Sequence, residues 1–201
     1  MRTERKQDND VWFRMKSHSD YEKIFQALQG CMDRIAPWSG VIYRSTSPRY
    51  YSRNQILSGE GGSRRGGRWN PVGIKAVYGS LTPETAMAET LQLYRYRKIP
   101  IVEAMPKVFV ATEVSISRTL DLRNTDTLRI LNVSLEEILD EDWRMKEERG
   151  EESLSQAIGR AAYSAGAEGI LAPAAADRMG TNVVVYPEGL AAGSMMEVVR
   201  L

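Results

Sequence analysis

The sequence predicts a single α+β domain with a mixed β-sheet and flanking helices. Its 201 residues suit one domain. After a first helix, short apolar runs and helical patterns follow in the order β, β, α, β, α, α, β, β, which does not fit repeated βαβ units. No linker or internal repeat divides the chain. We therefore expect residues 1–20 to be a loosely ordered N-terminal segment and residues 21–201 to form one domain.

The composition argues against several classes of protein. The 27 Lys and Arg residues nearly balance the 26 Asp and Glu residues, whereas a dedicated nucleic-acid binder usually shows a basic excess. No apolar run is long enough for a membrane-spanning helix, and the N-terminus lacks the apolar core of a secretory signal. Cys31 and His18 are single residues of their types, so we expect no disulfide and no metal site. We expect a cytoplasmic protein that binds neither membrane nor nucleic acid.

The N-terminal half opens on an amphipathic helix. Asp20 can cap this helix, and Pro37 is expected to end it. A short strand follows at residues 41–44. The apolar stripe of the helix consists of Ile24, Leu28, Cys31 and Ile35.

Residues 45–71 form the least ordinary segment of the chain. The segment holds five glycines, which predicts a loop rather than a helix or a central strand. Between Tyr43 and Arg68 inclusive there are six arginines and one acidic residue, Glu60. Glycines let backbone amides approach a phosphate, and guanidinium groups bind its oxygens in pairs. An anion site is therefore one interpretation, and a solvated loop is the other.

A strand and a well-capped helix follow this loop. The strand is expected at residues 76–80, and Thr82 and Pro83 are favourable residues for the helix start. Residues 107–114 are rich in β-branched side chains and predict the next strand. The apolar stripe of the helix consists of Met87, Leu91 and Tyr94.

The C-terminal third contains two capping-box patterns, beginning at Ser134 and Ser153. Each predicts the start of a helix. Between them, residues 140–152 carry seven acidic and three basic residues and are expected to be a solvated surface segment. Two further strands are expected at residues 169–172 and 183–186.

Several motifs resemble the RES domain family. The most specific is a Gly-Gly-Arg-Trp-Asn-x-x-Gly signature at residues 66–73. The resemblance extends over residues 38–190. The other matching motifs are Tyr43-Arg44, Gly59, Val77-Tyr78-Gly79-Ser80, Ala88-Glu89, Asp142-Trp143-Arg144, Ile158-Gly159, Gly169-Ile170-Leu171-Ala172-Pro173 and Asn182-Val183-Val184-Val185.

The resemblance implies a fold similar to ADP-ribosyltransferases and the function of a bacterial toxin. RES proteins belong to toxin–antitoxin pairs and are neutralised by a helix-turn-helix antitoxin. They degrade NAD⁺ by hydrolysis or phosphorolysis, and some members are linked to ADP-ribosylation of a protein. NAD⁺ would thus be a substrate, and no prosthetic group is expected. The sequence does not fix the oligomeric state, and a homo-oligomer with the acidic segment 140–152 as a contact surface is one alternative.

The resemblance also implies a set of site residues. Arg44 and Glu89 match the arginine and the glutamate of the family name, whereas Ala174 stands where the family has its serine. The implied catalytic residues are Arg44, Glu89 and Tyr78. The residues implied to bind NAD⁺ are Arg44, Arg68, Trp69, Asn70, Tyr78 and Ala174.

Each implied role has a chemical reason. A carboxylate at Glu89 can stabilise positive charge on the ribose carbon as nicotinamide leaves. Arg44 and Arg68 would hold the pyrophosphate, and Tyr78 could stack on nicotinamide. Nicotinamide in NAD⁺ is already a cationic leaving group, so the reaction needs no general acid.

Without the resemblance, the same residues have ordinary structural interpretations. Glu89 lies opposite the apolar stripe of its helix and would be solvated, although Ala86 and Leu93 flank it. Tyr78 and Trp69 would be packing residues. Arg44 would be an ion-pair partner.

Three functions stay open, the third of them because of Ala174. The first is a toxin-like enzyme that cleaves the nicotinamide–ribose bond by hydrolysis or phosphorolysis. The second is an ADP-ribosyltransferase that modifies a protein. The third is a weakened NAD-binding module, because alanine cannot make the hydrogen bond of the family serine.

Overall fold

The short apolar runs form one mixed sheet in the computed structural model, which describes residues 15–50 and 52–199. Within these residues the sheet has six strands in the order β1-β2-β5-β4-β3-β6, and β1 also pairs with β3. The β3–β4 pair is parallel and the other pairs are antiparallel. The strands are β1 (Ala36–Thr46), β2 (Val77–Ser80), β3 (Val108–Asp121), β4 (Gly169–Pro173), β5 (Thr181–Val185) and β6 (Met195–Val198).

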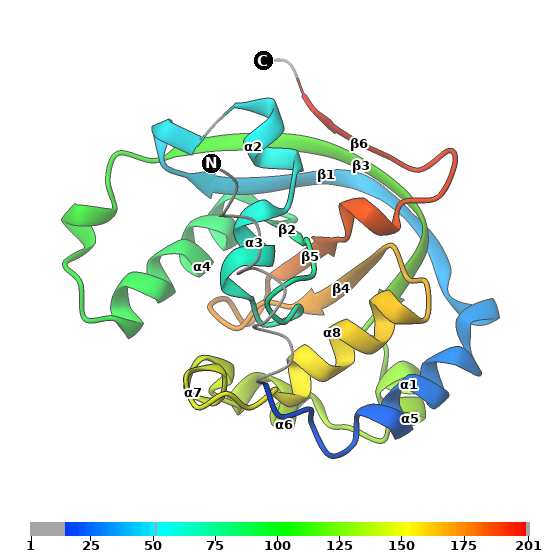
Figure 1. Ribbon diagram of the computed structural model, residues 1–201. Coiled ribbons are helices and arrows are strands. Elements are labelled where there is room, and N and C mark those ends of the chain that lie inside the picture. The colour runs from blue at the N-terminus through cyan, green and yellow to red at the C-terminus, as the bar shows by residue number, and fades with distance from the viewer. Residues whose placement is uncertain (1–14, 51, 200–201) are drawn as a thin grey trace, which may run out of the picture.

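Helices cover one side of the central strands. Figure 1 shows β1 and β3 running together above β2, β5 and β4, with α8, α1 and α5 on the opposite side. The helices are α1 (Tyr21–Gln29), α2 (Arg53–Leu57), α3 (Glu60–Arg65), α4 (Pro83–Tyr96), α5 (Thr125–Leu131), α6 (Leu135–Asp140), α7 (Trp143–Glu148) and α8 (Leu154–Ser164). The predicted α+β class with a mixed sheet and flanking helices is confirmed.

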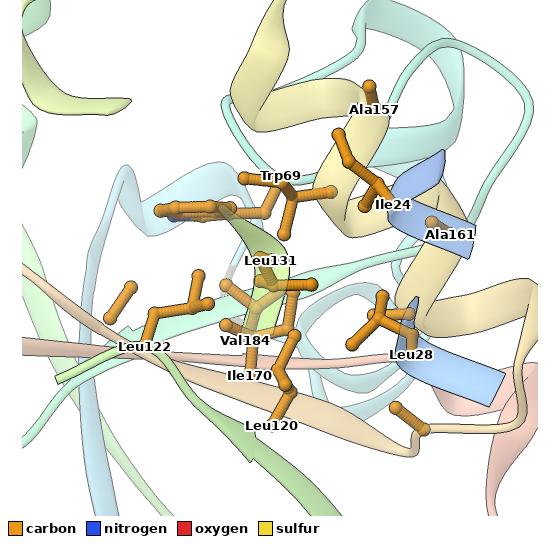
Figure 2. Close-up of a cluster of buried hydrophobic side chains, with 14 of the residues drawn as sticks. Ile24, Leu28, Trp69, Leu120, Leu122, Leu131, Ala157, Ala161, Ile170 and Val184 are labelled. Atoms are coloured by element: carbon orange, nitrogen blue, oxygen red, sulfur yellow. The ribbon is translucent and has the colours of Figure 1, made fainter. Parts of the chain in front are cut away.

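Strands β4 and β5 are buried on both faces because their alternate side chains enter two different cores. Ile170 and Val184 pack with Ile24, Leu28 and Trp69 against α1 and α8, as Figure 2 shows. The residues that alternate with them face the β1–β3 pair. This second core consists of Ile42, Val114, Ile116, Leu171, Val183 and Val185. Burial on both faces explains why these strands are continuous apolar runs.

The predicted helix starts are confirmed at three positions. The Thr82 side chain accepts a hydrogen bond from the Thr85 amide at 3.1 Å, and Pro83 occupies the first turn of α4. Both capping boxes, at Ser134 and Ser153, are formed. The predicted apolar stripe on α4 is wrong, because its buried residues are Thr85 and Ala86.

The first helix is shorter than predicted. It ends at Gln29 and is followed by Gly30, while Pro37 lies inside β1. The pairing of β1 with β3 shifts register between Ala36 and Trp38. A bulge of this kind tolerates proline because one ladder hydrogen bond is already missing there.

The predicted loop at residues 45–71 contains two helices, so the inference from its glycines is wrong. Gly61 and Gly62 lie inside α3. A Cβ atom on Gly62 would lie 2.8 Å from the Ala76 carbonyl oxygen. Glycine is therefore used here for close approach of two backbone segments rather than for a flexible loop.

Residues 140–152 are not simply a solvated segment. They contain α7, and Glu152 is only 4% exposed. Arg160 donates to Glu152 Oε1 at 2.6 Å, and the His18 amide donates to Glu152 Oε2 at 3.0 Å. The buried acid therefore ties the chain before α1 to α8. Residues 1–14 of the predicted N-terminal segment lie outside the described residues.

The patterns also missed some structure. Strand β3 continues beyond residue 114 to Asp121, and neither α5 nor β6 was predicted. None of the described helices combines the length and the apolar character needed to cross a lipid bilayer.

Candidate active site

The glycine-rich segment, α4, α7 and the β4–β5 connection surround a pocket of about 280 Å³. Helices α4 and α7 lie on the same side of the molecule (Figure 1). Three arginines and one glutamate contribute the charge of the lining. The lining residues are Gly61, Gly62, Arg65, Gly66, Gly67, Arg68, Trp69, Tyr78, Glu89, Gln92, Trp143, Arg144, Pro173, Ala175 and Asn182.

Glu89 is held on the pocket wall by two hydrogen bonds. Asn182 Nδ2 donates to Glu89 Oε1 at 2.9 Å, and the Ala176 amide donates to the same oxygen at 3.1 Å. Within the described residues, no hydrogen bond reaches Oε2. One carboxylate oxygen therefore fixes the side chain, and the other is available to a ligand. Glu89 is half-buried rather than solvated, because α4 turns the face with Ala86 toward the sheet.

Tyr78 and Asn70 brace the glycine-rich turn. The Tyr78 hydroxyl donates to Asn70 Oδ1 at 2.6 Å and accepts from the Trp69 amide at 2.9 Å. Asn70 Nδ2 donates to the carbonyls of Gly62, Pro71 and Ile74. Burial raises the pKa of Tyr78, so its hydroxyl stays protonated and can donate. Both polar atoms of the buried Asn70 side chain therefore have hydrogen-bond partners in the protein, and Asn70 does not line the pocket.

Trp69 is a packing anchor as well as a lining residue. Its side chain is 2% exposed and belongs to the core against α8 (Figure 2). The Tyr186 hydroxyl donates to the Trp69 carbonyl at 2.9 Å. The turn that forms the pocket is thus fixed directly to the main core.

Replacing Tyr78 with phenylalanine is expected to lower the free energy of unfolding by about 1–3 kcal/mol, because two buried polar groups lose their partner. The melting temperature should fall by about 2–4 °C for each kcal/mol lost. Thermal or urea unfolding measures this change. Tyr50→Phe is the matched control, because Tyr50 is 54% exposed. Equal losses in the two variants would contradict a bracing role for Tyr78.

Two of the lining arginines are partly buried. Arg68 Nη1 donates to the Ile138 carbonyl at 2.6 Å. Burial lowers the pKa of Arg68, and repulsion from Arg144 adds to this effect. Burial likewise lowers the pKa of Arg144. Arg65 is exposed at the rim.

Arg44 and Ala174 lie outside the pocket lining. Arg44 Nη1 donates to the Ile56 carbonyl at 3.1 Å, and burial lowers its pKa. Ala174 is 3% exposed, and its amide donates to the Gly180 carbonyl at 3.0 Å. Their contacts with NAD⁺ stay predictions.

The site contains residues that were not predicted as site residues. Trp143, Arg144, Gln92 and Asn182 line the pocket. Two of the matching motifs include Trp143, Arg144 and Asn182, but the charge run around α7 favoured a solvated segment. Gln92 carried no signal in the sequence. Among the described residues, no group of His, Cys, Asp and Glu side chains is arranged to hold a metal ion.

The comparison of the chain with known families finds a match. The RES domain model matches residues 41–200, so the chain belongs to the RES domain family. The predicted family is therefore confirmed.

Among its relatives is "NAD(+) phosphorylase MbcT" of Mycobacterium tuberculosis and of Mycobacterium bovis. Each is 26% identical over 161 residues, which is 79% of either chain. The crystal structure of the M. tuberculosis MbcT–MbcA toxin–antitoxin complex contains a chain of the same fold. The two superpose with a TM-score of 0.67 at 24% identity, over 88% of this chain and 91% of the other.

Proposed function

We propose that this protein cleaves the nicotinamide–ribose bond of NAD⁺ with inorganic phosphate as the acceptor. The observation that carries the proposal is Glu89, a carboxylate fixed through one oxygen in a pocket that also holds Arg68 and Arg144. This charge pattern suits a substrate with a phosphate-rich body and a reaction that develops positive charge on a sugar. The similarity to MbcT supports phosphate as the acceptor.

The proposed reaction is a displacement at the ribose carbon that bears nicotinamide. The bond from this carbon to the ring nitrogen breaks, and its electron pair neutralises the cationic ring, which leaves as nicotinamide. A phosphate oxygen forms the new bond to the same carbon and gives ADP-ribose 1″-phosphate. The transition state has oxocarbenium character, so a nearby carboxylate stabilises it. Glu89 supports this role, because its Oε1 is fixed by two hydrogen bonds and its Oε2 accepts none within the described residues.

Phosphate as the acceptor also suits the residues of the pocket. At neutral pH phosphate is an anion with unprotonated oxygens, so its attack requires no general base, whereas water must lose a proton. No histidine is among the lining residues of the described pocket. Arg68 would bind phosphate oxygens of the substrate. Hydrolysis of NAD⁺ and transfer of ADP-ribose to a protein are the alternative reactions that the same pocket could carry out.

We further propose that the protein is the toxin of a toxin–antitoxin pair. The complex of MbcT with MbcA supports an antitoxin partner. The helix-turn-helix character of that partner stays a prediction from the family, and a homo-oligomeric state stays a prediction as well.

The proposal is tested by incubating the folded protein with NAD⁺, with and without inorganic phosphate at constant ionic strength. We expect nicotinamide release that increases with phosphate concentration, together with a product of the mass of ADP-ribose phosphate. Release without phosphate dependence and with free ADP-ribose would indicate hydrolysis. If NAD⁺ raises the melting temperature but stays intact, the protein is the weakened module that Ala174 suggested. Ala174→Ser then shows whether the missing serine is the cause.

A further inference from the structure

Arg144 is a half-buried cation without a polar partner in the structure. Its guanidinium contacts two aromatic rings, but it has no hydrogen bond or ion pair to any residue within 15–50 and 52–199. A guanidinium carries five N–H donors, and partial burial without hydrogen bonds is costly. The side chain nevertheless lines the pocket rather than extending into solvent. These features indicate that Arg144 is placed for a ligand.

The surroundings of Arg144 fix its orientation. Its guanidinium lies over the Trp143 ring at 4.5 Å and over the Tyr96 ring at 5.2 Å. Cation–π contacts of this kind use the charge of the guanidinium and leave its N–H groups available as hydrogen-bond donors. The Tyr96 hydroxyl donates to Asp142 Oδ2 at 3.1 Å, and Asp142 Oδ1 accepts from the Met145 amide at 3.0 Å. The end of α4 thereby holds the start of α7, which carries Arg144.

A second guanidinium lies close enough to Arg144 to repel it. Repulsion from Arg144 contributes to the lowered pKa of Arg68. Neither arginine has an ion pair with an acid in the described part of the chain, and Glu89 lines the same pocket. Glu89 attracts both arginines, but neither forms an ion pair with it, so an anion that reaches both guanidinium groups would be bound favourably.

We propose that Arg144 and Arg68 together bind a phosphate group, and that Tyr96 and Asp142 act as positioning residues for Arg144. This inference deepens the proposed function and rests on it for the source of the phosphate group. The source is either the attacking inorganic phosphate or the pyrophosphate of NAD⁺. Both present the same oxygens to the arginines.

Binding is tested without turnover, by calorimetric titration of the full chain with inorganic phosphate and with ADP at constant ionic strength. We expect Arg144→Gln to weaken binding of at least one of these probes about 10- to 100-fold, because charge-assisted hydrogen bonds are lost. Arg129→Gln is the control, because it removes the same charge from an exposed residue of α5 that does not line the pocket. If Arg144→Gln binds inorganic phosphate more weakly than the wild type, the arginines bind the attacking phosphate. If it binds ADP more weakly, they bind the pyrophosphate of NAD⁺.

The inference is overturned if Arg144→Gln binds both probes like the wild type, or if the wild type binds neither. These outcomes are independent of catalysis, so they are separate from a failure of the proposed function. The proposed function fails if the wild-type protein binds phosphate or ADP but leaves NAD⁺ intact. Circular dichroism and the melting temperature establish that each variant is folded.

The positioning role has its own test. Both Tyr96→Phe and Tyr96→Leu lose the hydrogen bonds to Asp142, but only Tyr96→Leu also loses the ring that contacts Arg144. We expect Tyr96→Leu to lower the affinity for the probe that Arg144 binds about 2- to 5-fold more than Tyr96→Phe does. An exposed cation–π contact contributes about 0.5–1 kcal/mol. Equal affinities of the two folded variants would contradict positioning by the ring.

Discussion

Replacing Glu89 with glutamine is expected to lower kcat for nicotinamide release about 100- to 1000-fold. The variant keeps an oxygen that accepts from Asn182 and from the Ala176 amide, so the side chain stays in place. It loses the negative charge that stabilises the oxocarbenium-like transition state. The effect therefore falls on kcat more than on the KM for NAD⁺. Steady-state assays of released nicotinamide measure both constants.

The matched control is Glu84→Gln, which removes a charge from an exposed residue at the start of the same helix. Its kcat should equal that of the wild type. In a bacterial host, induction of the wild type should deplete NAD⁺ and stop growth, and Glu89→Gln should do neither. Equal kcat values for wild type and Glu89→Gln would remove Glu89 from the chemistry.

Replacing Gly159 with alanine is expected to lower the free energy of unfolding by about 2–3 kcal/mol. A Cβ atom at this position would overlap the Trp69 carbonyl group, because α8 packs directly against the backbone of the glycine-rich turn. Tyr186 donates from its hydroxyl to the carbonyls of both Trp69 and Gly159, which ties the two segments together. The clash outweighs the gain of about 1 kcal/mol that alanine normally gives in a helix.

Gly61→Ala is the control for this prediction. Gly61 is also helical, but a Cβ atom there would meet nothing within 4 Å. Its substitution should leave stability unchanged or raise it by up to about 1 kcal/mol. The two variants are compared by urea unfolding. A Gly159→Ala variant as stable as Gly61→Ala would mean that α8 does not pack against the turn as described.

The fold could be predicted where one local signal dominates. Thr82, Ser134 and Ser153 start helices because a side-chain oxygen satisfies a free backbone amide, and this depends on neighbouring residues alone. The helical Gly62 could not be predicted, because its place depends on packing against the distant Ala76. The prediction that the first helix ends at Pro37 was wrong for a similar reason, because the place of Pro37 at a bulge depends on the pairing of β1 with β3.

The site was predicted in part. The family motifs placed Glu89, Arg68, Trp69 and Tyr78 at a single site, and all four line the pocket. Periodicity alone would have made Glu89 a solvated residue, because a helical wheel does not show that the β4–β5 connection covers that face of α4. Arg144 was missed because a run of charged residues usually indicates solvated surface. Its burial depends on rings contributed by α4 and α7.

We expect this pocket to hold NAD⁺ with its scissile bond at Glu89. The most direct measurement is a crystal structure of the Glu89→Gln variant, which is expected to bind NAD⁺ without cleaving it. We expect the nicotinamide-bearing ribose carbon beside residue 89 and phosphate oxygens within hydrogen-bond distance of Arg68. A dinucleotide bound with its nicotinamide ribose outside the pocket would show that Glu89 does not act on the scissile bond.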